Sequence, residues 1–70
     1  MGNKYTIHIF WSNEDEGFIG ICDEFPGLSA FGETREDALT ETEIAHTLMI
    51  EHYQESGQTL PEPQSMLVAA

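Results

Sequence analysis

The hydrophobic pattern of this 70-residue chain changes its period once, at Thr34. Before Thr34, side chains alternate between two faces over residues 5–11 and 18–23, which is typical of β-strands. From Thr34 to Gly57, apolar residues recur at the spacing of a helix that packs one side against a sheet. Because the connections between the strand segments are short, the strands must pair antiparallel. The sequence therefore predicts an α+β fold of the order β-β-β-α, a three-stranded antiparallel sheet with one long helix packed on one face.

Turn residues separate the expected strands. Residues 12–17 offer no apolar anchor and predict a hairpin connection. Pro26 and Gly27 predict a tight turn, because proline presets one backbone dihedral and glycine accepts a positive one, and a third strand is expected over residues 28–32. The second strand carries apolar residues on both of its faces. We therefore expect it at the centre of the sheet.

The expected helix has both a start signal and a stop signal. Thr34 followed by Asp37 resembles a capping box, and Gly57 suits the position just beyond a helix end. Ile44 lies among acidic residues on the outer side of the helix, so we predict it as an oligomer contact. The side expected to pack against the sheet holds Ala38, Leu39, Thr42, Ala45, Leu48, Met49 and His52.

The part of the chain after the helix carries a weaker pattern. A single domain is expected over residues 1–70, with an ordered core over residues 4–57. The prolines in residues 60–63 predict a rigid extended segment, and residues 66–68 predict either a short fourth strand or nothing regular. Residues 58–70 are thus expected to be an extended tail or a short edge strand.

Charge narrows the classes of partner. The chain has 13 Asp and Glu residues against 2 Lys and Arg, a formal net charge of -11, and its 40% of hydrophobic residues favours a folded domain. A surface of this sign repels phosphates, so we expect no direct binding of nucleic acid or of a membrane and favour a basic protein partner. No apolar run approaches the roughly 20 residues of a membrane span, which predicts a cytoplasmic protein.

Small size predicts self-association. The chain is near the lower limit at which one core can hold a domain folded without help. Cys22 is its one cysteine, so it cannot form an internal disulfide, and the sequence has neither a CxxC pair nor a Cys/His metal pattern. We expect a dimer or a higher homo-oligomer, formed through Ile44 or through an exposed edge of the first or third strand.

Candidates for metal binding are acidic pairs and triplets. Glu14, Asp15 and Glu16 offer carboxylate oxygens, but they lack the ligand spacing of a calcium loop, and a solvated hairpin tip is the favoured interpretation. Asp23 and Glu24 would need other acids beside them to form a two-metal nuclease site, which is the least favoured alternative.

Candidates for acid–base or nucleophilic catalysis do not assemble into a set. His8 is expected on a strand, and His46 and His52 on a helix at a spacing that points them away from a common metal. His52 near the helix end is expected to favour the helix dipole. Cys22 is predicted to be a small buried hydrophobe. We therefore predict no cofactor, no metal site and no enzymatic activity.

One surface stays without cover in the expected arrangement. His8 and Phe10 lie on the sheet face opposite Ile7 and Ile9, and a single helix can cover only one face. An uncovered apolar surface on a small domain marks a protein interface or is masked by self-association, and both alternatives stay open.

Five stretches of the chain, in this order and at this spacing, resemble the HicB family of antitoxins. The resemblance covers nearly the whole chain and implies the HicB-like fold, which is in part similar to ribonuclease H. Many members continue into a C-terminal DNA-binding domain, and this sequence, which ends at Ala70, resembles the short form without it. The five stretches are Tyr5, residues 16–20 (EGFIG), residues 23–27 (DEFPG), residues 32–39 (GETREDAL) and Gly57 with residues 60–63 (LPEP).

The resemblance implies an antitoxin of a toxin–antitoxin system. Such a protein binds a small basic HicA-type toxin, which cleaves mRNA, and neutralises it by occlusion. The acidic balance fits that partner, because opposite charges speed association. A stand-alone HicB-like oligomeric module without a toxin partner is the first alternative, and a metal-dependent nuclease is the second. The partner-binding residues that we expect are Glu14, Asp15, Glu16, Asp23 and Glu24, together with His8 and Phe10.

Overall fold

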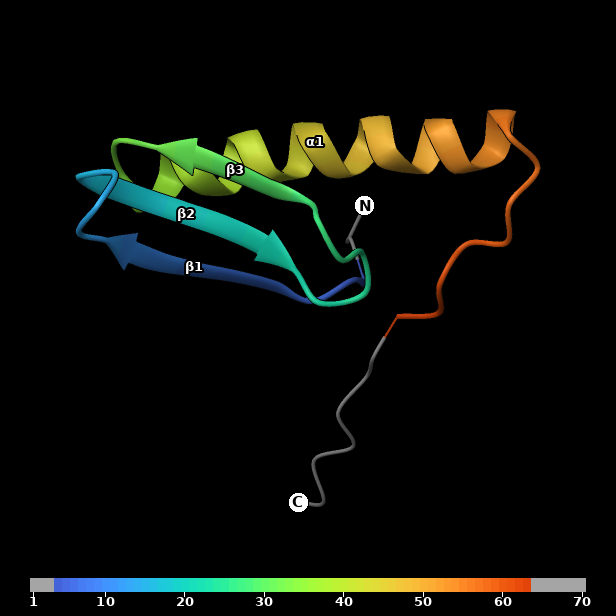
Figure 1. The fold of residues 1–70 in the computed structure, drawn as a ribbon, viewed down its shortest axis with the longest axis horizontal. Helices are drawn as coiled ribbons and strands as arrows, with labels where there is room; N and C mark the ends of the chain where they lie inside the picture. Colours follow the sequence, from blue (N-terminus) through green and yellow to red (C-terminus); the bar gives the residue numbers. More distant parts are fainter. Residues whose placement is uncertain (1–3, 64–70) are drawn as a thin grey trace, which may run out of the picture.

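Three strands and one helix form two layers in the computed structural model, which describes residues 4–63 (Figure 1). The strands pair antiparallel in the order β1-β2-β3, so β2 is central as expected. The helix lies along one face of the sheet (Figure 1). These observations confirm the α+β class and the β-β-β-α order. The elements are β1 (Ile7–Ser12), β2 (Gly17–Cys22), β3 (Ser29–Gly32) and α1 (Arg35–Glu55).

The pairing register decides which residues face the helix. Ile9 pairs with Gly20, and Gly20 pairs with Ala30, which places these three residues on the face that α1 covers. Their neighbours along each strand point the other way, because side chains alternate across a sheet. We call that second face the outer face. It holds His8, Phe10, Ser12, Gly17, Ile19, Ile21, Ser29 and Phe31.

Local signals set the turns and the helix ends as expected. The turn between β2 and β3 closes through a hydrogen bond from the Leu28 backbone N–H to the Phe25 carbonyl at 3.1 Å, and Gly27 there has a φ of 91°. At the start of α1, the Thr34 hydroxyl accepts a hydrogen bond from the Asp37 backbone N–H at 3.0 Å. Gly57 follows the helix with a φ of 73°, a conformation that favours glycine.

The core lies at one end of the sheet, between the turn that follows β2 and the second half of α1. Its centre is Phe25, which is 1% exposed and packs with Cys22 and Leu28. The Phe25 ring meets the rings of Tyr5 and Tyr53 edge to face, at centroid distances of 5.0 and 5.4 Å. Edge-to-face contacts of this kind stabilise a core beyond the area that they bury.

Helix α1 contacts the sheet through part of the side that was expected. Leu39 and Leu48 are 41% and 60% exposed and His52 is exposed, so placing these three on the packing side was wrong. Thr42 is buried as expected, and His46, which was not placed on that side, is buried as well. The physical reason is the close approach of α1 to the sheet.

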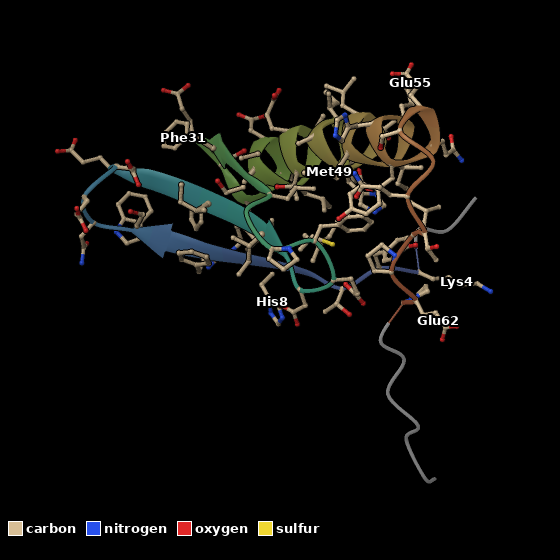
Figure 2. All side chains as sticks on the ribbon, turned by 45° about the vertical axis from the view of Figure 1, so that its right-hand side comes forward. Lys4, His8, Phe31, Met49, Glu55 and Glu62 are labelled. Carbon is tan, nitrogen blue, oxygen red and sulfur yellow. The ribbon has the colours of Figure 1, made fainter. Side chains whose placement is uncertain are left out.

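Two glycines let α1 approach the sheet closely. A Cβ at Gly20 would overlap the Thr42 hydroxyl, and a Cβ at Gly32 would overlap the backbone of Ala38. Where backbones come this near, only small helix residues fit, and the large side chains rotate to the flanks. The packing side therefore begins with Ala38 and Thr42 and continues into Met49, which Figure 2 labels below the helix.

The segment after the helix folds back onto the core. Leu60 packs against the core cluster, and the Tyr5 hydroxyl donates a hydrogen bond to the Pro61 carbonyl at 2.7 Å. Residues 58–63 have no regular secondary structure, and the predicted fourth strand at residues 66–68 lies outside the described residues. No helix within residues 4–63 is both long and apolar enough to cross a membrane.

Candidate partner-binding surface

The outer face of the sheet presents an apolar row across all three strands. Phe10 pairs with Ile19, and Ile19 pairs with Phe31, so the three side chains lie side by side. The two phenylalanines are 45% and 44% exposed. The next row holds His8, Ile21 and Ser29. An apolar surface of this kind on a small domain is typical of a protein interface.

Phe31 extends the surface beyond what the sequence predicted. The sequence predicted Phe10 and His8 of β1 as part of the site. It missed Phe31, because the face on which Phe31 lies depends on how β3 pairs with β2. The signal that could have found Phe31 is the alternation of side chains along β3, because Phe31 pairs with Ile19 and so shares its face.

Carboxylates lie at both ends of this surface and not within it. None of the three strands contains an aspartate or a glutamate. Glu14, Asp15 and Glu16 lie in the hairpin at one end of the sheet, and Asp23 follows β2 at the other end. The arrangement joins an apolar centre to an acidic rim, which complements a partner with an apolar centre and basic edges.

The hairpin turn is closed by hydrogen bonds between Ser12 and Asp15. The Ser12 hydroxyl donates to the Asp15 carboxylate at 2.8 Å, and the Asp15 backbone N–H donates to the Ser12 hydroxyl at 3.3 Å. Glu16 adopts a φ of 52°, in the left-handed region, and this turns the chain into β2. The three acids therefore lie in a defined turn, and all three are exposed.

At the end of the sheet opposite the hairpin, the Asp23 side chain pairs with His8 of β1. Its carboxylate lies 2.8 Å from Nε2 of His8, and both side chains are exposed. His8 points away from the helix (Figure 2). The two predicted partner-binding residues thus meet on the outer face, where a partner could reach both.

Glu24 does not belong to the acidic rim, and its predicted place there is corrected. The residue is 7% exposed, and its carboxylate accepts hydrogen bonds from the backbone N–H and the hydroxyl of Thr6. The Cys22 thiol also donates to it at 3.6 Å. Asp23 and Glu24 are adjacent in sequence, yet they point to opposite faces. The arrangement does not join their carboxylates in one metal site.

Two of the other titratable candidates, His46 and Cys22, are buried in the fold. Burial lowers the pKa of His46 below its ordinary value, with the nearby charges of Glu24 and Glu43 acting in the opposite direction. Burial raises the pKa of the Cys22 thiol, which keeps it in the unreactive protonated form. Cys22 is therefore a small buried hydrophobe, as predicted.

An aromatic pair marks the hairpin end of the face that α1 covers. Trp11 is 52% exposed, and its ring meets that of Phe18 edge to face at 5.2 Å. The guanidinium of Arg35 lies 5.0 Å from the centre of the Phe18 ring. This cation–π contact ties the start of α1 to β2 and gives one of the two strongly basic side chains a structural role.

Comparisons with known proteins add no relative to this picture. No family model matches the chain, and searches of curated proteins and of solved structures find no similar one. Within residues 4–63, no three histidine, cysteine or acidic side chains gather where they could hold a metal ion. The outer face is therefore the feature of the described residues that points to a function.

Proposed function

We propose that this protein is a binding module that covers a small basic protein with the outer face of its sheet. The observation that carries the proposal is the row Phe10, Ile19 and Phe31, in which both phenylalanines are exposed between two acidic strand ends. Apolar contacts at the centre would set the lifetime of such a complex, and the acids at its edge would speed its formation.

The resemblance to HicB antitoxins names the class of partner. We propose a HicA-type toxin, a small basic mRNA-cleaving protein, as the protein that this chain occludes in the cytoplasm. A net charge of -11 supports this choice, because it attracts a cationic protein and repels the RNA that the toxin would otherwise bind. Occlusion needs no catalytic group on this chain, and we accordingly propose that it is not an enzyme.

Affinity capture tests the proposal. The tagged chain should recover a small basic protein, and the double substitution of Phe10 and Phe31 by serine should abolish the capture. Leu39→Ser is the matched control, because it removes an exposed apolar side chain from the helix and leaves the outer face unchanged. The recovered protein should cleave mRNA, and the wild-type chain should suppress the cleavage. Capture that survives the double substitution would refute the role of the outer face.

A stand-alone oligomeric module is the second candidate, and one observation favours it. The buried hydrophobic core consists of Cys22, Phe25, Leu28 and Ala38 among the described residues, which is small for a domain with exposed aromatic side chains. Self-association through the outer face would cover those aromatic side chains, and the strands themselves hold no carboxylates that would repel each other. Sedimentation at micromolar concentration should then show a dimer or larger species, and a folded monomer of 7.8 kDa would exclude this candidate.

A further inference from the structure

The solvent side of α1 carries a second surface, separate from the outer face of the sheet. Ile44 and Leu48 are 51% and 60% exposed, although both are large and apolar. They lie four residues apart, so their side chains meet on one side of the helix. We call the line of residues that continues this pair along the helix the α1 seam. It consists of Asp37, Glu41, Ile44, Leu48, Glu51 and Glu55, all of them exposed.

The spacing of the α1 seam is that of a helix–helix contact. Its residues follow one another at intervals of four, three, four, three and four, the alternation by which one helix packs along another. None of the six is buried by the residues that the structure describes. Figure 2 shows Glu55 pointing away from the sheet, at the last turn of this line. The seam is therefore open to a second helix.

Charge decides what kind of helix fits. The centre of the seam is apolar, and both of its ends are acidic. In an antiparallel pair of two copies with Ile44 opposite Leu48, Glu41 would face Glu51 of the second copy. In a parallel pair each carboxylate would face its own counterpart. Like charges held opposite each other oppose binding, so the seam disfavours a second copy of this chain.

We propose that the α1 seam docks an amphipathic helix that carries two apolar residues at its centre and lysine or arginine at both ends. The apolar residues would cover Ile44 and Leu48, and the basic residues would meet the four carboxylates. This proposal goes beyond the proposed function, because it concerns a separate surface and does not depend on the outer face of the sheet.

A synthetic helical peptide tests the proposal on the full chain. The probe has two leucines at the central seam positions and lysine at the four flanking positions, and a matched peptide replaces each lysine by glutamate. We expect the lysine peptide to bind, to shift the backbone amide signals of residues 37–55 in NMR spectra, and to bind more weakly as salt increases. The glutamate peptide should not bind.

Substitutions on the protein separate a specific seam from general attraction between opposite charges. Ile44→Ser with Leu48→Ser should weaken binding of the lysine peptide by about tenfold or more, as for a buried apolar anchor. Glu41→Gln with Glu51→Gln should weaken it several-fold and reduce its salt dependence. Glu36→Gln with Glu43→Gln is the matched control, since it removes the same charge from α1 off the seam and should have less effect.

Three results would overturn the proposal. One is equal weakening by the two charge-removing pairs, which would show general electrostatic attraction. Another is peptide-induced shifts on the strands, which would place the peptide on the sheet. The last is a lower sedimentation mass for the serine variant than for the wild type, which would assign the seam to a second copy. Circular dichroism of each variant serves as the control for folding.

Discussion

The Glu24 carboxylate accepts a hydrogen bond from the Thr6 backbone N–H at 2.9 Å and another from the Thr6 hydroxyl at 3.1 Å. The backbone bond from Asp23 N–H to the Thr6 carbonyl, at 3.1 Å, lies beside them. Together these bonds join the residue before β1 to the turn after β2. Burying a carboxylate that is 7% exposed is unfavourable without such hydrogen-bond partners. Glu24 therefore has a structural role, in which it connects the two segments.

Glu24→Leu should destabilise the protein by about 1–3 kcal/mol, because it removes the acceptor of two partly buried Thr6 donors. Glu24→Gln should cost less, since its amide oxygen can keep the bond to the Thr6 backbone. The free energy of unfolding from urea titration measures both effects. Glu33→Gln, at an exposed position, is the control and should stay within about 0.5 kcal/mol of the wild type.

Gly32→Ala should destabilise the protein by about 1–3 kcal/mol or more, because its Cβ would overlap the backbone of Ala38. Gly17→Ala is the matched comparison. Its Cβ would overlap the ring of Phe31 on the outer face, and a side chain can move where a helix backbone cannot. Thermal unfolding of the two variants should show the larger loss for Gly32→Ala, and equal losses would contradict the close approach of α1 to the sheet.

The stability of the fold should fall as the pH falls through about 6.5, the ordinary pKa of histidine. Burial lowers the pKa of His46 in the folded state, so the unfolded chain binds a proton more readily. The free energy of unfolding is therefore largest above pH 6.5 and decreases until the pH passes below the lowered value. Urea titrations at a series of pH values from about 7.5 to 5.5 measure this slope. Most carboxylates titrate below this range, so they contribute little to it. His46→Gln should flatten it, and a slope that His46→Gln leaves unchanged would contradict this assignment.

Surface-plasmon kinetics should separate the two parts of the outer-face site. With the captured basic partner, the combined variant Glu14→Gln, Asp15→Asn and Glu16→Gln should slow association and reduce its salt dependence, with a smaller effect on dissociation. Phe10→Ser should speed dissociation by roughly tenfold. The two variants are expected to change different rates because charges at the edge act on association and a buried apolar anchor acts on dissociation.

A matched charge control makes the kinetic test specific. The variant Glu36→Gln, Glu43→Gln and Glu62→Gln removes the same number of exposed acids away from the outer face. It should change the association rate less than the hairpin variant does. If both variants slow association equally, the hairpin acids contribute only through net charge, and the acidic rim is not a recognition feature.

Features that depend on a few neighbouring residues were predictable from the sequence. The bond between Thr34 and Asp37, the turn at Gly27 and the helix end at Gly57 each involve groups within about one turn of one another. The strand alternation likewise identified β1 and placed Phe10 on the uncovered face. Local backbone geometry determines such features, so the sequence is sufficient.

Only the tertiary structure decided which residues are buried between the layers. Leu48 looked suited to the core and is exposed, whereas His46 is buried beside Phe25, with ring centroids 5.1 Å apart. The cause is non-local: Gly20 and Gly32 set how closely α1 approaches the sheet, and this rotates its large side chains outward. The burial of Glu24 is also a non-local effect. Its partner Thr6 is 18 residues away in the chain and comes near only when β1 pairs with β2.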